Sequence, residues 1–229
     1  MLKENYLKIL ERVKKACDKI NKDYRNITIV SVSKTFKAEL IKEIYDAGHR
    51  DFGENYIQEA LKKIEKLPDD IRWHYVGRLQ TNKCKDAVGR FSLIHSVDSL
   101  KLLNEISKRA ELKNIKQNIL LQINFHKEET KAGFQNIDEL IGVIEAGIKL
   151  KNINIRGLMT IPPFTDNPEN TRPHFAKLRE TFELIKTKYS IDRFDILSMG
   201  MTDDFEVAIE EGANYIRIGR AIFGERKYD

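Results

Sequence analysis

Short apolar segments alternate with helical segments along the whole chain, and this alternation is the feature that most constrains the fold. Eight short apolar segments are each followed by a helix or a helical turn. The expected strands cover residues 27–34, 51–53, 72–76, 92–97, 118–124, 155–161, 194–198 and 214–219. Strands that alternate with helices indicate a parallel sheet with helices packed on it.

The number of strands and the length of 229 residues favour a single (β/α)8 barrel, a fold of about 250 residues. A doubly wound open sheet is the alternative architecture. The stretch 2–20 has apolar residues at helical spacing and predicts an extra N-terminal helix. No linker rich in Gly or Ser interrupts the sequence, so residues 1–229 are interpreted as one domain. Further helices are expected at 38–47, 55–66, 80–88, 99–111, 136–146, 171–188 and 203–211, with Asp98 as the N-cap of the helix at 99–111.

Charge and cysteine content argue against several classes of protein. Lys and Arg number 40 and Asp and Glu 35, which gives a net charge of +5 with the two signs interspersed. This pattern favours a mixed surface over a basic arm for nucleic acids. Cys17 and Cys84 have neither metal-ligand nor disulfide-framework spacing, and no segment has the character of a signal peptide or a membrane span. We therefore expect a cytoplasmic protein that binds neither membranes nor nucleic acids.

Polar residues gather where the expected strands end, which is where barrels of this kind carry their chemistry. The strand ends contain Lys34, 53–55, 74–78, Asn124, 159–160, 198–202 and 217–220. After the seventh strand, Ser198, Gly200 and Thr202 supply two hydroxyls and a closely approachable backbone. After the eighth, Gly219 and Arg220 add backbone N–H donors, so the last two loops are a candidate phosphate site. The alternative is that Ser198 and Thr202 only cap turns, with Thr202 as the N-cap of the next helix.

Lys34 ends the first strand, and closure of a barrel would bring this strand beside the eighth. A phosphorylated aldehyde held by the last two loops could then react with the lysine amine, because lysine forms Schiff bases once its pKa is lowered. If side chains alternate along the eighth strand, Arg217 points to the same side as Tyr215 and Gly219. There it could supply a nearby cation or bond a ring nitrogen. The alternative is that Lys34 is an ordinary solvated charge.

Several stretches of the chain, taken in order, resemble one known family. They read VSVSKTF, DFGENYIQE, WHYVGRLQTNK, KAGF, GLMTIPP and LSMGMTDDFEVAIEEGANYIRIGRAIFGER, and the resemblance runs from about residue 28 to residue 226. Their order and spacing are similar to those of the pyridoxal phosphate homeostasis proteins, which are single-domain relatives of the N-terminal barrel of alanine racemases. No single stretch is decisive, but the combination is highly specific.

The resemblance implies a (β/α)8 barrel of the alanine racemase N-terminal type that holds pyridoxal 5′-phosphate (PLP) as a Schiff base on Lys34. It implies the cofactor-binding residues Lys34, Asn55, Ser198, Thr202, Arg217, Gly219 and Arg220, and the pocket-lining residues His74, Met159, Met199 and Gly200. Ser198, Thr202 and the 219–220 backbone would contact the phosphate, and Arg217 would face the pyridine nitrogen. Two positions depart from the family, with Arg220 where Thr or Ser is usual and Thr202 where Ser is usual.

An arginine beside the pyridine nitrogen bears on whether the chain is an enzyme. Because Arg does not give up its proton, it leaves the nitrogen unprotonated and PLP a weak electron sink. Alanine racemases also use a tyrosine from a C-terminal β domain, whereas this chain ends at Asp229, soon after the eighth strand. We therefore expect a monomeric, non-catalytic carrier and regulator of PLP that passes it to apo-enzymes. The alternative is a weak racemase or decarboxylase that uses Tyr56 or His74 as its second base.

Two basic features remain outside this interpretation. One is a cluster made of Arg78, Lys83, Lys85 and Arg90. Such a cluster would suit a nucleic-acid binder, but it lacks interleaved aromatic residues for base stacking, so we interpret it as one solvated helix face. The other is Lys131, which is either surface charge or part of a secondary phosphate site used during transfer. A phosphate-binding barrel without aldehyde chemistry is the remaining alternative function.

Overall fold

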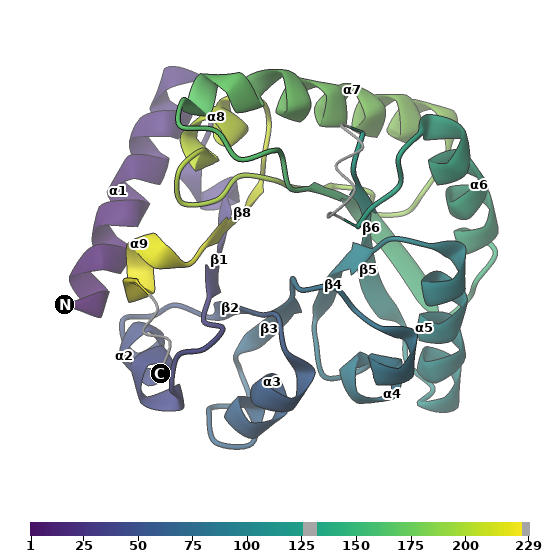
Figure 1. The fold of residues 1–229 in the computed structure, drawn as a ribbon, viewed down its shortest axis with the longest axis horizontal. Helices are drawn as coiled ribbons and strands as arrows, with labels where there is room; N and C mark the ends of the chain where they lie inside the picture. Colours follow the sequence, from purple (N-terminus) through teal and green to yellow (C-terminus); the bar gives the residue numbers. More distant parts are fainter. Residues whose placement is uncertain (126–131, 226–229) are drawn as a thin grey trace.

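Eight parallel strands close into a barrel in chain order, with β8 paired to β1 (Figure 1). The computed structural model describes residues 1–125 and 132–225. The strands are β1 (Thr28–Val32), β2 (Asp51–Glu54), β3 (Arg72–Tyr75), β4 (Leu93–Val97), β5 (Gln117–Ile123), β6 (Ile153–Thr160), β7 (Ile196–Ser198) and β8 (Tyr215–Ile218). This closure confirms the predicted (β/α)8 barrel and excludes the doubly wound sheet, because an open sheet would leave β1 and β8 unpaired.

Helices surround the barrel on its outer side (Figure 1). They are α1 (Leu2–Lys19), α2 (Ala38–Asp46), α3 (Ile57–Ile64), α4 (Cys84–Ala87), α5 (Leu100–Leu112), α6 (Ile137–Gly147), α7 (Arg172–Lys188), α8 (Phe205–Glu210) and α9 (Arg220–Phe223), with 3-10 turns η1 (Tyr24–Asn26), η2 (Thr81–Lys83) and η3 (Pro168–Thr171). The predicted N-terminal helix is α1, which packs against α8 and α9. Its buried residues include Ile9, Val13 and Cys17, as the helical spacing of apolar residues requires. Helix α9 had no counterpart in the prediction.

Apolar side chains form two separate cores. The larger core lies between the barrel and the helices and includes Phe52 on β2 and Ile41 on α2. The smaller core consists of Leu93, Leu120, Met159 and Ile196, from strands β4 to β7. This separation is expected for a closed barrel, whose strands alternate residues between the interior and the helices. The two cores hold the strand ends in fixed positions and therefore fix the loops that follow them.

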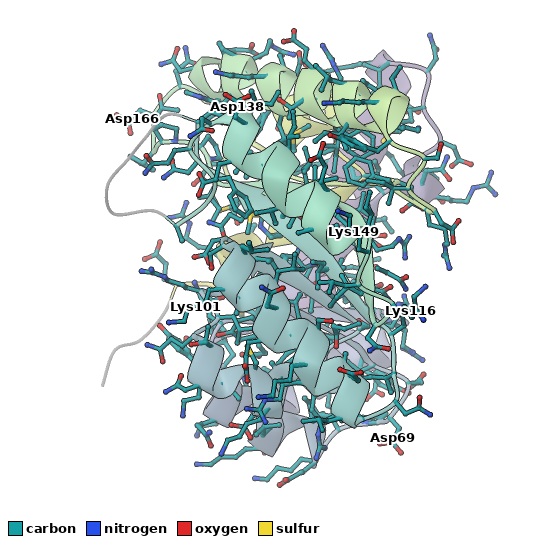
Figure 2. All side chains as sticks on the ribbon, turned by 90° about the vertical axis from the view of Figure 1, so that its right-hand side faces the viewer. Asp69, Lys101, Lys116, Asp138, Lys149 and Asp166 are labelled. Atoms are coloured by element: carbon teal, nitrogen blue, oxygen red, sulfur yellow. The ribbon has the colours of Figure 1, made fainter. Side chains whose placement is uncertain are left out.

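The carboxyl ends of the strands all meet at one face of the barrel. Figure 2 shows this in side view: Lys101 and Asp138, at the beginnings of α5 and α6, lie toward one side. Lys116 and Lys149, which precede β5 and β6, lie toward the opposite side. Because every strand runs in the same direction, the predicted site residues that follow the strands share the face of Lys101 and Asp138.

A bulge in β6 shapes the strand that carries Met159 and Thr160. Gly157 has a φ of +148°, and the pairing with β5 shifts register beside it. A Cβ at this position would lie 1.9 Å from the carbonyl oxygen of Ile196 on β7. Glycine is therefore required both by the backbone conformation and by the close approach of the two strands.

Two predicted helix caps are wrong. Ser99, not Asp98, is the N-cap of α5: its backbone is extended and its hydroxyl accepts a hydrogen bond from the N–H of Leu102 at 3.3 Å. Likewise the N-cap of α8 is Asp204, so the interpretation of Thr202 as a helix cap is not supported.

In the described part of the chain, no helix has the length and apolarity needed to cross a membrane.

Candidate functional site

Lys34 lies in the turn that directly follows β1 and is partly buried. Strand β8 runs beside β1, with Ser31 paired to Ile218. One residue further along, a Cβ on Gly219 would lie 3.4 Å from the carbonyl oxygen of Val32. The loop that carries Gly219 and Arg220 is therefore adjacent to the turn that carries Lys34, as predicted from barrel closure.

The residues on both sides of Lys34 are held by a buried ionic cluster. Lys63, on α3, donates hydrogen bonds from Nζ to the carbonyl of Ser33 (2.8 Å), to Glu54 Oε1 (2.7 Å) and to Glu59 Oε1 (2.5 Å). Glu59 Oε1 also accepts the N–H of Thr35 at 2.6 Å. Thr35 has a φ of +70°, a conformation that a β-branched residue rarely adopts without support. The cluster therefore fixes the turn on either side of the lysine.

Glu54 is the fully buried member of this cluster. Its Oε1 accepts the hydroxyl of Ser33 at 2.6 Å as well as Lys63, whereas Oε2 has no hydrogen-bond partner in the structure. Burial raises the pKa of Glu54, and the ammonium of Lys63 and the Ser33 hydroxyl oppose this shift. No local pattern in the sequence indicates the cluster, because its members come from the turn after β1, from β2 and from α3.

The loops after β7 and β8 are joined to each other. Gly200 has a φ of +91°, and a Cβ there would come within 2.6 Å of the Cβ of Ala208, so the turn after β7 requires glycine. The guanidinium of Arg220 contacts both carboxylate oxygens of Asp203 at 2.7 Å. Thr202, next to Asp203, is partly buried. The guanidinium of Arg220 is thus occupied by Asp203. The backbone N–H of Arg220 is therefore a better candidate than its side chain for binding an anion.

Arg217 points into the barrel from β8 and is buried. Its Nη1 donates to the Ser198 hydroxyl at 2.7 Å and its Nη2 to the carbonyl of Thr160 at 2.8 Å. Burial lowers the pKa of Arg217 to about 10, and the carboxylate of Asp204 opposes this shift. The side chain is therefore a buried cation at neutral pH. Ser198 is fully buried beside it, and a direct contact between Ser198 and a phosphate remains a prediction.

Hydrogen bonds continue from Ser198 across the barrel interior. Ser198 Oγ lies 2.9 Å from His95 Nδ1, and His95 Nε2 lies 3.1 Å from His74 Nδ1. His74 Nε2 in turn lies 3.0 Å from Asp51 Oδ1, which also accepts Nε of Arg72 at 2.8 Å. His74 is buried, whereas Asn55 is partly buried, and both ring nitrogens of His74 have a partner. The sequence interpretation missed Asp51 and His95, although strand periodicity could have placed both on the interior face.

We expect Asp51 to make stability sensitive to acid. Burial acts to raise the pKa of Asp51, but hydrogen bonds from His74 and Arg72 outweigh it and hold this pKa far below its ordinary value of 3.8. A lowered pKa stabilises the folded state above pH 3.8, and this contribution is lost as the pH falls further. Urea unfolding should show Asp51→Asn less stable by about 1–3 kcal/mol at neutral pH, with the difference shrinking below pH 4. A difference that is constant across this range would contradict the assignment.

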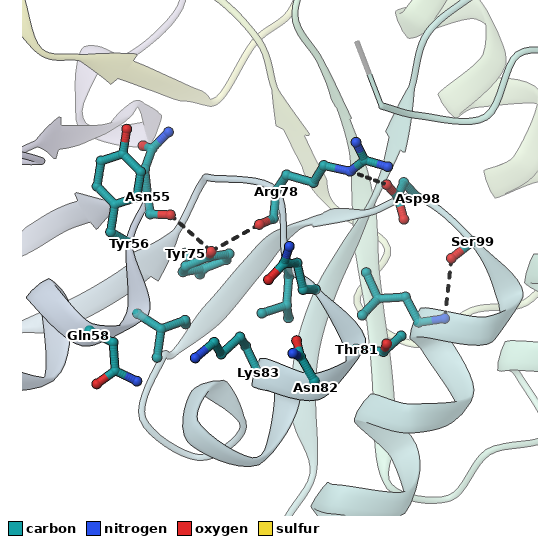
Figure 3. A pocket seen from close by; sticks show the side chains of 14 residues that line it. Asn55, Tyr56, Gln58, Tyr75, Arg78, Thr81, Asn82, Lys83, Asp98 and Ser99 are labelled. Atoms are coloured by element: carbon teal, nitrogen blue, oxygen red, sulfur yellow. Dashed lines mark hydrogen bonds and ion pairs between the residues drawn. The ribbon is translucent and has the colours of Figure 1, made fainter. Parts of the chain in front are cut away.

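A polar cavity of about 910 Å³ opens beside Asn55, between the loops that follow β2, β3 and β4 (Figure 3). Its lining includes Tyr56, Arg78 and Lys83. The hydroxyl of Tyr75 lies 3.0 Å from the carbonyl of Asn55 and 3.1 Å from that of Arg78, so it ties two of the loops together. The side-chain oxygen of Asn55 is buried and has no hydrogen-bond partner in the structure. A ligand that brings a hydrogen-bond donor would satisfy it.

The other predicted residues lie in several places. Met159 and Met199 are fully buried, and Met159 belongs to the small apolar core inside the barrel. The four basic residues near β3 do not share one helix face, because Arg78 is in a loop, Lys83 in η2, Lys85 in α4 and Arg90 beyond it. Lys131 lies outside the described residues. Within residues 1–125 and 132–225, no three His, Cys, Asp or Glu side chains are grouped so that they could hold a metal ion.

A closed parallel barrel with a lysine after β1 and a buried arginine on β8 defines a (β/α)8 barrel of the alanine racemase N-terminal type. The family model described as alanine racemase, N-terminal domain, matches residues 9–227. A pyridoxal phosphate homeostasis protein of Aquifex aeolicus is 47% identical over 228 residues, which cover 98% of each chain. The chain therefore belongs to the family of pyridoxal phosphate homeostasis proteins.

Solved structures agree with this assignment. PipY of Synechococcus elongatus, determined with PLP bound, is 34% identical and has a TM-score of 0.81, with 93% of this chain and 100% of that chain covered. An alanine racemase of Clostridium difficile has a TM-score of 0.74 at 18% identity. The match covers all of this chain and 56% of the racemase, and at this identity it bears on the fold alone.

Proposed function

We propose that this chain binds PLP as a Schiff base on Lys34 and serves as an intracellular carrier and regulator of the cofactor. The observation that carries the proposal is barrel closure, which sets the Lys34 turn beside the loop of Gly219 and Arg220. PLP has an aldehyde and a phosphate, and this arrangement offers an amine and an anion-binding loop at adjacent strand ends. The relatives named as pyridoxal phosphate homeostasis proteins and the PLP-bound PipY support it.

The chemistry of the described residues fits PLP at this face. Lys34 supplies the amine, and Thr202 with the backbone of 219–220 supplies donors for the phosphate. Arg217 is a buried cation on the neighbouring strand and would face the pyridine nitrogen. The unpartnered side-chain oxygen of Asn55 is available to a hydrogen-bond donor on the ligand. When bound, PLP supplies an electron-withdrawing ring, and the protein residues orient it.

Arg217 favours holding the cofactor over using it for catalysis. Its pKa of about 10 keeps the guanidinium protonated at neutral pH, so it can donate to the pyridine nitrogen but cannot accept a proton from it. A pyridine nitrogen without its proton withdraws electrons weakly, which disfavours carbanion chemistry. We therefore place this chain among carriers and not among racemases or decarboxylases.

The two candidates for a second catalytic base are poorly suited to that role. His74 is buried in the barrel, and both of its ring nitrogens are engaged by Asp51 and His95. Tyr56 is 56% exposed and lines the open cavity beside Asn55. A weak racemase remains the second candidate function, favoured only by the position of Tyr56 at the mouth of the barrel.

Two measurements on the PLP-loaded protein separate these functions. We expect that it restores activity to a PLP-dependent apo-enzyme, and that it exchanges the α-proton of D- or L-amino acids with deuterium far more slowly than an enzyme would. Exchange at enzyme-like turnover that is lost in Lys34→Ala would overturn the carrier proposal in favour of a racemase. The apo-enzyme alone and free PLP serve as controls for the transfer.

The proposed function also includes a cellular compartment, an oligomeric state and partners. We propose that the protein acts as a monomer in the cytoplasm, with apo-enzymes as transient recipients of PLP. The thiols of Cys17 and Cys84 are free and buried, which is compatible with a reducing compartment. The mixed surface charge gives no support for a nucleic acid or a membrane as a further partner.

A further inference from the structure

The hydrogen bonds inside the barrel form one continuous chain whose two ends have fixed roles. At one end, the guanidinium of Arg217 can only donate, so Ser198 Oγ must accept from it. At the other end, the ionised carboxylate of Asp51 can only accept, so His74 Nε2 must carry a proton. Arg72 holds Asp51 in place with bonds to both of its carboxylate oxygens.

The two fixed ends determine the protons between them. Ser198 Oγ accepts from Arg217, and its own hydroxyl donates to its other partner, His95 Nδ1. Burial, His74 and Arg217 all lower the pKa of His95, so this ring is neutral and carries its one N–H on Nε2. His95 Nε2 therefore donates to His74 Nδ1, which is an acceptor, and the proton of His74 is on Nε2. Every bond therefore points the same way, from Arg217 through Ser198, His95 and His74 to Asp51.

This polar chain has a cost that an apolar filling would avoid. The small apolar core is formed instead by Leu93, Leu120, Met159 and Ile196, whose side chains need no hydrogen bonds. A buried polar network is stable only when each member has its partner. This row of hydrogen bonds ends at Arg217, the side chain predicted to face the pyridine nitrogen of PLP, and the two hydrogen bonds of its guanidinium go to neutral oxygens. The hydrogen bonds align a row of dipoles from the buried Arg217 cation toward the carboxylate of Asp51.

We propose that Asp51, His74 and His95 are positioning residues for the cofactor: they orient the Ser198 hydroxyl so that its lone pair holds the Arg217 guanidinium in place beside the PLP ring. This inference rests on the proposed function. None of the three residues needs to touch PLP. If one hydrogen bond in this row reverses its direction, the next group must exchange its donor and acceptor roles. A change in the hydrogen bonding of Asp51 is therefore transmitted through both histidines to the hydroxyl of Ser198.

The direction of the chain can be tested without PLP by nitrogen NMR of ¹⁵N-histidine-labelled protein. At neutral pH we expect His74 and His95 both to be neutral with the proton on Nε2. Asp51→Asn keeps an oxygen that can accept from His74 but removes the charge that polarises the row of hydrogen bonds. It should therefore shift the ring nitrogens of His95 although, of the two histidines, the Asp51 carboxylate contacts only His74, and simple packing would not produce this transmitted effect. A doubly protonated His74, an Nδ1–H tautomer of either ring, or an unchanged His95 in the variant would overturn the proposed chain.

The consequence for the cofactor is tested by PLP titration of three variants matched for folding by thermal unfolding. His95→Leu breaks the chain and should weaken PLP binding by about tenfold or more, as expected when a hydrogen bond to a charged group is impaired. His95→Gln offers one donor and one acceptor and should recover part of the affinity and the wild-type absorption of bound PLP. Gln117→Leu is the control, because Gln117 is a buried polar side chain on β5 whose amide bonds the N–H of Gly89 and the carbonyl of Phe91, outside this hydrogen-bond chain, and the variant should bind like wild type.

Equal affinity and absorption in His95→Leu and wild type would overturn the positioning role. Equal losses in His95→Leu and Gln117→Leu would do the same, because they would indicate a general packing effect. If wild-type protein binds no PLP, the proposed function fails and the positioning role fails with it. The NMR result then still decides whether the directed chain exists.

Discussion

Lys34→Ala abolishes the covalent attachment of PLP while the barrel remains folded. Lys34 is in a turn after β1, outside the two apolar cores, so its removal deletes the amine without opening a cavity in the core. The measurement is borohydride reduction followed by mass spectrometry of the digested protein. In wild type, the reduced adduct should be found on the peptide that contains Lys34, and in the variant the adduct on this peptide should be absent.

Two further variants separate the amine from the charge. Lys34→Arg keeps a cation, but a guanidinium that does not lose its proton cannot attack an aldehyde, so it should also fail to form the adduct. Lys37→Ala is the control, because Lys37 is an exposed lysine three residues further along, at the N-cap of α2, and it should form the adduct as wild type does. An adduct of wild-type yield in Lys34→Ala, attached to another lysine, would refute the assignment of Lys34.

The elements that could be predicted from the sequence are those with a strong local pattern. Each strand is a short apolar segment, and each long helix has apolar residues at helical spacing, so both could be located to within a few residues. The adjacency of Lys34 and Gly219 also followed, because it depends only on eight strands closing in order. Side-chain alternation along the strand placed Arg217 on the same side as Tyr215 and Gly219, and in the structure Arg217 points into the barrel.

The parts that could not be predicted depend on pairs of residues far apart in the chain. His95 and Ser198 are 103 residues apart, and no local pattern indicates that their side chains meet. The same holds for Ser33 and Lys63, which are 30 residues apart and lie in the turn after β1 and in α3. Asp98 and Ser99 are both common N-cap residues, and only the backbone conformation decides between them. Strand alternation gives the face of a side chain but not its partner.

Lys63→Met should lower the free energy of unfolding by roughly 3–5 kcal/mol, because it leaves the buried carboxylate of Glu54 without its cation. Urea unfolding measures the loss. The double variant with Glu54→Gln should recover much of it, since the buried charge is then gone. Lys42→Met is the control: Lys42 forms an exposed pair with Asp46 at the same spacing as Lys63 with Glu59, and such pairs contribute about 0.5 kcal/mol. A loss below about 1 kcal/mol in Lys63→Met would contradict the role of the buried pair.

Loss of Lys63 should also change how stability depends on pH and how fast Lys34 reacts. Without Lys63, the remaining effect of burial raises the pKa of Glu54 further, and protonation then removes the buried charge. The stability lost in Lys63→Met should therefore be partly regained as the pH falls through this raised pKa. Lys63 also anchors the carbonyl of Ser33, and Glu59 anchors the N–H of Thr35. At a pH where the variant is folded, we therefore expect slower formation of the PLP adduct on Lys34, because the turn that aims the amine has lost its support.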